Sequence, residues 1–86
     1  MSYPNYKINF GKIIQECNRR QSKEWLEINQ FCKRKKLEHT ELIREAFERL
    51  GREDKELLKG NLSTHKGLRA LALLQRIMLE LAKGMA

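Results

Sequence analysis

Turn-forming residues are scarce in this sequence, which contains one Pro and five Gly among its 86 residues. No alternation of apolar and polar residues lasts long enough to predict a β-strand. Helices joined by short connections are the architecture that such a composition allows. We therefore predict an all-α fold, in which residues 1–86 form a single helical domain.

Cysteine is also rare, since Cys17 and Cys32 are the only two. Two cysteines exclude a disulfide framework. Their spacing from His39 and His65 does not fit a zinc finger, so no metal site is expected. A free Cys usually behaves as a small buried hydrophobe, and we predict that role for both.

The motifs of common enzymes are missing as well. The sequence has no nucleophile elbow, no Gly-rich phosphate loop and no paired-carboxylate motif. We expect neither an enzyme nor a cofactor, and no small-molecule substrate.

Signals for export and for membrane insertion are absent too. The start, "MSYPNYKINF", lacks the apolar core and cleavage site of a signal peptide. The apolar stretch "LRALALLQRIMLELA" is interrupted by charged residues and is too short to span a bilayer. These features predict a soluble, intracellular protein without a membrane partner. The end, "AKGMA", directly follows a predicted helix, as expected for the amino-terminal part of a longer protein.

Positive charge is what the sequence has in excess: 18 Lys and Arg against 11 Asp and Glu, a net charge of +7. The excess lies in residues 1–36 and 64–86, whereas residues 37–63 hold five cations and seven acids. An excess of this size in a short chain favours a polyanionic partner, nucleic acid before an anionic membrane.

Apolar spacing predicts three helices. The first runs from about Lys7 to Lys36, because one apolar stripe stays in phase across Ser22, although Ser22 could instead cap a second helix. The second runs from Thr40 to Gly60, with Gly51 tolerated in its interior. The third is capped by Ser63 or Thr64 and runs to about Lys83.

The apolar face of the third helix is wider than a small monomer can cover. We read it as core plus dimer interface, made by the following residues: Leu68, Leu71, Ala72, Leu73, Leu74, Gln75, Ile77, Met78, Leu79, Leu81 and Ala82. An isologous two-fold interface is the commonest kind. The predicted architecture is therefore a symmetric six-helix homodimer.

Two groups of cations are candidates for phosphate contacts. On a continuous second helix, one face carries Arg44, Arg49, Arg52, Lys55 and Lys59 opposite the apolar stripe. Acids share that face, so a helix with i,i+4 ion pairs (Glu45–Arg49 and Glu48–Arg52) is an equal alternative. The second group is the densest basic run, "CKRKKLEH", with Lys33, Arg34, Lys35 and Lys36. This run fits a solvated helix end, a phosphate contact or a nuclear address.

Two stretches resemble a known family. "FERLGREDKELLKGNLST" is similar, without a gap, to the second helix and following turn of the amino-terminal RNA-binding domain of influenza virus non-structural protein 1. The shared positions are Phe47, Arg52, Asp54, Leu58, Lys59, Gly60, Ser63 and Thr64. "INFGKIIQEC" looks like the first helix of the type B form of that domain. Together the two stretches cover about a third of the chain.

The resemblance implies a six-helix homodimer that binds double-stranded RNA through its paired second helices, without sequence preference. It assigns that binding to Arg52, Lys59, Ser63 and Thr64. It further implies a viral interferon antagonist, present in the host cytoplasm and nucleus and followed by an effector domain. Glu53 departs from the family, because typical type A members carry there the basic residue most needed for RNA. Glu56 also replaces a cation.

Two other function classes fit parts of the sequence. "KKLEHTELIREAFERLG" could form the helix–turn–helix of a small phage or plasmid DNA-binding regulator. Against it, no Gly-type turn between two short helices is expected, and the Asn, Gln and Arg cluster of base readout is missing. The third class is a helical protein-interaction module whose basic charge faces an acidic protein.

Overall fold

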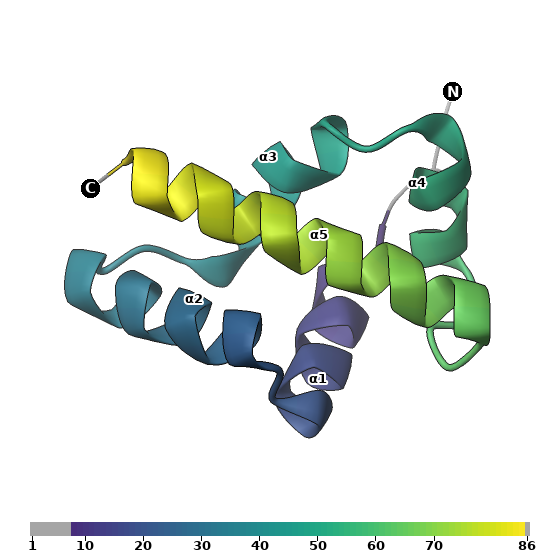
Figure 1. Cartoon of the computed structure of the whole chain (residues 1–86), viewed down its shortest axis with the longest axis horizontal. Helices are drawn as coiled ribbons and strands as arrows, with labels where there is room; N and C mark the ends of the chain where they lie inside the picture. The colour runs from purple at the N-terminus through teal and green to yellow at the C-terminus, as the bar shows by residue number, and fades with distance from the viewer. Residues whose placement is uncertain (1–7, 86) are drawn as a thin grey trace.

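The computed structural model describes residues 8–85 and shows an all-α protein with five helices in that range (Figure 1). They are α1 (Phe10–Arg20), α2 (Lys23–Lys35), α3 (His39–Glu48), α4 (Arg52–Lys59) and α5 (His65–Gly84). The predicted fold class is confirmed. The expected three-helix subunit is not what the chain forms, since two of the predicted helices are each broken in two.

The first break lies at Gln21 and Ser22. Gln21 adopts the left-handed conformation, with φ of 49°, and ends α1. The Ser22 hydroxyl then accepts a hydrogen bond from the Trp25 N–H at 3.1 Å and caps α2. The prediction of one continuous helix was therefore wrong, and the capping alternative was right. The predicted start at Lys7 lies outside the described residues.

The second break lies at Arg49–Gly51. Gly51 has an extended backbone, with ψ of 167°, and is the N-cap of α4. Glu53 and Asp54 fill the first turn of α4, where negative charge stabilises a helix N-terminus. Gly51 is thus a helix boundary, not an interior residue. The predicted end at Gly60 is correct, whereas the predicted cap at Thr40 is wrong, because α3 begins at His39 with Glu38 as its N-cap.

The third predicted helix is confirmed as α5. Its N-cap is Thr64, whose hydroxyl accepts a hydrogen bond from the Gly67 N–H at 2.9 Å. In Figure 1, α5 runs through the middle of the molecule, with α1 and α2 on one side of it and α3 and α4 on the other. It packs against α2, α3 and α4, while α1 contacts α3. The last helix in the sequence is therefore the centre of the fold.

The core surrounds the buried face of α5. The largest fully buried side chains come from α1, α2, α3 and α5: Ile13, Cys17, Trp25, Ile28, Leu42, Ile43, Leu71, Leu74 and Met78. Gln75 of α5 is also buried and accepts a hydrogen bond from the Ser22 hydroxyl at 2.6 Å. Most of the wide apolar face of α5 is thus covered within one chain. Leu73, which is 37% exposed, is the large apolar residue of α5 that stays most open.

Candidate nucleic-acid interface

The C-terminal end of α2 carries four consecutive exposed cations, called here the basic end: Lys33, Arg34, Lys35 and Lys36. Lys36 is left-handed, with φ of 56°, and the Leu37 N–H donates to the Cys32 carbonyl at 2.9 Å. This closes the helix in a Schellman-type turn. Within residues 8–85, none of the four cations forms an ion pair. Their charge is therefore directed at solvent.

A fifth cation, Lys83, comes close to the basic end from α5. A groove of about 170 Å³ between α2 and α5 is lined by Arg34, Lys83, the polar side chains of Glu27 and Gln30, and apolar side chains that include Phe31. The Arg34 guanidinium carbon lies 5.7 Å from the centre of the Phe31 ring. Figure 1 shows that α2 and α5 end on the same side of the molecule. The tertiary fold thus enlarges a cluster that the sequence showed only as a local run.

The predicted cation row on α3 and α4 is divided by the break at Gly51. Arg44 lies on α3 with its guanidinium carbon 5.7 Å above the Phe10 ring. Arg49 caps the end of α3, and Arg52 is the first residue of α4. Both are exposed, and neither forms an ion pair in the described part of the chain. These three cations therefore do not continue one helical face.

The two lysines of α4 are engaged with neighbouring side chains. Lys55 Nζ lies 3.9 Å from Glu48 Oε1 and 5.7 Å above the Phe47 ring. Lys59 Nζ lies 3.3 Å from Glu56 Oε2. The two i,i+4 pairs considered above, Glu45–Arg49 and Glu48–Arg52, do not occur in residues 8–85, because the helix ends between their members. In this region Lys55 and Lys59 therefore form ion pairs with glutamates, whereas the arginines are exposed to solvent.

Ser63 and Thr64 serve the connection that leads into α5. The Thr64 hydroxyl donates to the Asn61 carbonyl at 3.1 Å while it caps the helix. The Ser63 N–H donates to Asn61 Oδ1 at 2.8 Å, which forms an Asx turn. Both residues are exposed. The structure gives Thr64 a capping role, as its position in the sequence predicted.

Of the residues considered for metal binding, Cys17 and Cys32 are buried, His39 is half-buried and His65 is exposed. Burial raises the pKa of the Cys17 thiol to about 12, and burial also raises the pKa of Cys32. Both thiols are free and buried, as predicted. His39 Nε2 lies 2.6 Å from Asn29 Oδ1, its ring stands 5.0 Å from the Trp25 ring, and burial lowers its pKa. Residues 8–85 hold no group of three side chains that could bind a metal ion.

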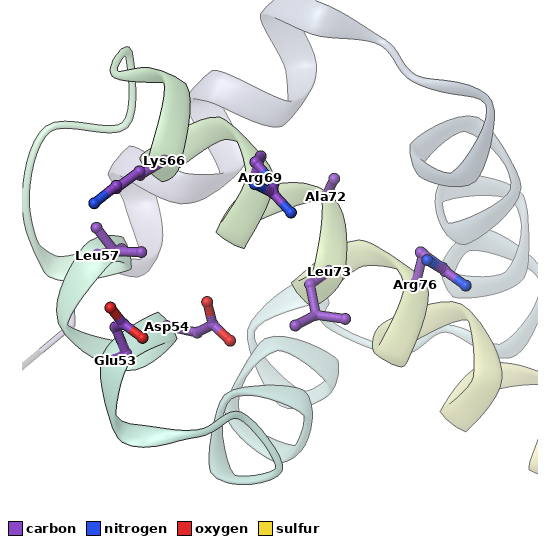
Figure 2. A pocket seen from close by; sticks show the side chains of 8 residues that line it. All are labelled: Glu53, Asp54, Leu57, Lys66, Arg69, Ala72, Leu73 and Arg76. Carbon is purple, nitrogen blue, oxygen red and sulfur yellow. The ribbon is translucent and has the colours of Figure 1, made fainter.

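A second surface, called here the α4–α5 groove, has a volume of about 530 Å³ (Figure 2). Its α4 wall is formed by Glu53, Asp54 and Leu57. Its α5 wall is formed by Lys66, Arg69, Ala72, Leu73 and Arg76. Figure 2 shows Glu53 and Asp54 below Lys66 and Arg69, with Leu57 and Leu73 between the two helices and Arg76 farther along α5. The groove therefore combines apolar side chains with two oppositely charged walls.

The cations of α5 were not among the predicted site residues. Arg69, Arg76 and Lys83 follow one another at seven-residue steps, which places them on one side of a helix. All three are exposed. Because the bounds of this helix were predicted closely, the seven-residue spacing could have identified these three cations from the sequence.

Searches against known protein families, curated proteins and solved structures found no match. In the described part of the chain, no helix has both the length and the apolar character needed to cross a membrane. The candidate nucleic-acid interface therefore rests on the geometry of this structure alone, and the resemblance to the influenza domain stays a prediction.

Proposed function

We propose that this protein binds double-stranded RNA through its phosphate backbone, without reading the bases, and that it does so as a homodimer. The observation that carries the proposal is the basic end of α2, where four consecutive exposed cations have no acidic partner within residues 8–85 and are joined by Lys83. A cluster of this kind is suited to positioning on phosphates.

The basic end takes precedence over the α3–α4 row for a physical reason. A cation that is already held by a carboxylate gains less from a phosphate, since the existing pair must first be broken. Lys55 and Lys59 are held in this way, by Glu48 and Glu56. Arg49 and Arg52 remain as a secondary contact on the same chain. The proposed site is therefore centred on α2, not on α4.

Duplex RNA is the preferred ligand because of its shape and charge. A-form RNA hides its bases in a deep, narrow groove and presents phosphates and 2′-hydroxyl groups. Counterion release from the phosphates would supply most of the affinity and make it fall steeply with salt. Two copies of the basic end on one dimer would contact two positions along the same duplex, which raises the affinity through effective concentration. A role in shielding viral RNA from interferon sensing follows from the resemblance and belongs to the same proposal.

A gel-shift titration at two salt concentrations tests the proposal. The probes are a blunt RNA duplex of about two turns, the same sequence as a DNA duplex, and single-stranded RNA. We expect selective binding of the RNA duplex. The double variant Lys33→Gln/Lys35→Gln should weaken it and lower the slope of log K against log salt by about 2. The control is Lys12→Gln/Lys23→Gln, which removes two exposed lysines that form no ion pair within residues 8–85, and it should bind almost as the wild type does.

Two other outcomes would change the assignment of the RNA-binding site or exclude it. Loss of binding in Arg52→Ala, with Lys33→Gln/Lys35→Gln unaffected, would place the site on α4, where the influenza resemblance puts it. No shift of any probe at either salt would leave the basic end as a solvated surface.

A second candidate function has one observation in its favour. α3 and α4 are two short helices joined by Arg49, Leu50 and Gly51, which is the kind of connection that a helix–turn–helix uses. The stretch considered above as a helix–turn–helix, residues 35–51, contains one complete helix, α3, and the connection between α2 and α3 has no Gly. Against this function, the exposed part of α4 includes Glu53 and Glu56, whose charge repels DNA. Equal or tighter binding of the DNA duplex in the same titration would favour the DNA-binding regulator.

A further inference from the structure

The α4–α5 groove has two charged walls that do not neutralise each other. Glu53 and Asp54 lie on the α4 side, and Lys66, Arg69 and Arg76 lie on the α5 side (Figure 2). No ion pair within residues 8–85 joins one wall to the other. Both signs of charge are therefore available to a second molecule.

The middle of the groove is apolar. Leu57 comes from α4, and Ala72 and Leu73 come from α5. Leu73 is 37% exposed, and within residues 8–85 only Leu26 and Met85 are large apolar side chains left more open than it is. An apolar centre with a charged rim is the usual anatomy of a protein–protein interface. The groove therefore has the composition of a contact surface.

We propose that the α4–α5 groove is the surface on which a second copy of this chain docks, which gives the proposed homodimer its interface. A surface with its two signs on separate walls complements itself under a two-fold rotation. The α5 cations of each copy then face the α4 carboxylates of the other, and the contact is made twice. A partner of one sign would satisfy one wall and be repelled by the other.

The overall charge of the chain supports this choice of surface. Each copy carries a net charge of +7, so two copies repel each other at most orientations. Association is favourable only where acids and cations of both copies meet. Glu53 and Asp54 are adjacent acids that line a groove opposite three cations, and they supply that meeting point. The basic end of α2 lies outside the groove and stays open to RNA in such a dimer.

Sedimentation velocity over a range of protein concentrations, without RNA, tests this docking. The wild type should form a dimer whose population rises with protein concentration. Leu73→Asp should raise the dimer Kd by at least about tenfold, as expected for a residue at the centre of an interface. Leu26→Asp is the matched control, a leucine 47% exposed that lies on α2 outside the groove, and should dimerise normally.

A charge exchange provides a second test that does not depend on Leu73. Asp54→Arg and Arg69→Asp should each weaken the dimer, and the double variant Asp54→Arg/Arg69→Asp should recover most of the lost affinity. Circular dichroism confirms that each variant is folded.

Three results would overturn the docking. They are a wild type that stays monomeric at every concentration, a dimer broken by Leu26→Asp but not by Leu73→Asp, and single charge variants that change nothing. A monomer that instead binds an acidic or basic peptide in the groove would assign it to a different protein. Because no RNA is present, failure here is distinguishable from failure in the gel shift.

Discussion

Replacing Gly67 by Ala should destabilise this protein, although Gly→Ala in a helix usually has the opposite effect. Gly67 lies in the first turn of α5, buried against the connection from α4. A Cβ atom at this position would stand 2.6 Å from the Asn61 carbonyl oxygen, 2.9 Å from the Thr64 hydroxyl and 3.2 Å from Leu62 Cα. Two of these three atoms belong to the backbone and cannot rotate away, so the connection itself must shift.

The magnitude follows from three contributions. Helix propensity favours Ala over Gly by about 1 kcal/mol. Overpacking a tight site costs about 1–3 kcal/mol, and displacing the Thr64 hydroxyl from its capping position costs about another 1 kcal/mol. The net expectation is a loss of about 1–3 kcal/mol in the free energy of unfolding. For a domain of this size, each lost kcal/mol lowers Tm by about 4–8 °C.

Urea unfolding measures this loss directly. It can be followed by circular dichroism and by the fluorescence of Trp25, which is fully buried in the native state. Gly84→Ala is the matched control, since Gly84 is also in α5 but a Cβ there would meet nothing within 4 Å. The control should be as stable as the wild type or slightly more stable. If the Gly67→Ala variant is as stable as the wild type, the connection between α4 and α5 does not approach α5 as closely as the structure shows.

Three further expectations rest on single side chains. Ser22→Ala should lower the free energy of unfolding by about 1–2 kcal/mol in urea titrations, because the hydroxyl caps α2 and donates to buried Gln75; wild-type stability would contradict the cap. Burial lowers the pKa of His39 below its usual 6.5, so the unfolded chain takes up that proton first, and Tm should fall between pH 7 and pH 5. His39→Gln should show a smaller fall, and an identical pH profile would exclude this contribution. Cys17 and Cys32 should react with a thiol reagent only slowly in native buffer and quickly in urea, since burial raises both pKa values; fast native labelling would show that they are accessible.

α5 was predictable because its signals are local. Thr64 stands at the N-cap, apolar residues follow at helical spacing, and the helix ends at Gly84, with Met85 as its C-cap. None of these signals depends on what the helix packs against. The start and the end of α5 could therefore be derived from the residues at its own boundaries.

The first break was missed because it depends on the size of the whole molecule. An uninterrupted helix over residues 7–36 would be about 45 Å long at 1.5 Å per residue, but the longest dimension of the described structure is 36 Å. The chain must turn to place Ile13 and Trp25 in one core. It turns at Gln21, a left-handed residue that could not be predicted because this conformation is usually adopted by Gly. The apolar stripe stays in phase across the turn, which made one long helix look consistent.

The candidate sites show the same division between local and tertiary information. Lys33, Arg34 and Lys35 were found as a sequence run, and the structure leaves all three exposed. The α4–α5 groove could not be found in this way. Glu53 and Arg69 face one groove only because α4 leaves α3 at Gly51 and returns to α5. A helical wheel for residues 40–60 assumes one continuous helix, and it therefore places Glu53 on the wrong face, because α3 ends at Glu48 and α4 begins at Arg52.

Because α5 lies at the centre of the fold, the other helices can complete their packing only after α5 has been synthesised. Residues 65–84 leave the ribosome after the other four helices of the described structure, and they supply the surface on which α2, α3 and α4 pack. Until then, the segments at 23–35, 39–48 and 52–59 lack the helix with which each makes its most extensive contact. Domains fold as cooperative units, and unpaired apolar surface on a nascent chain invites aggregation. Completion of the fold therefore follows synthesis of α5.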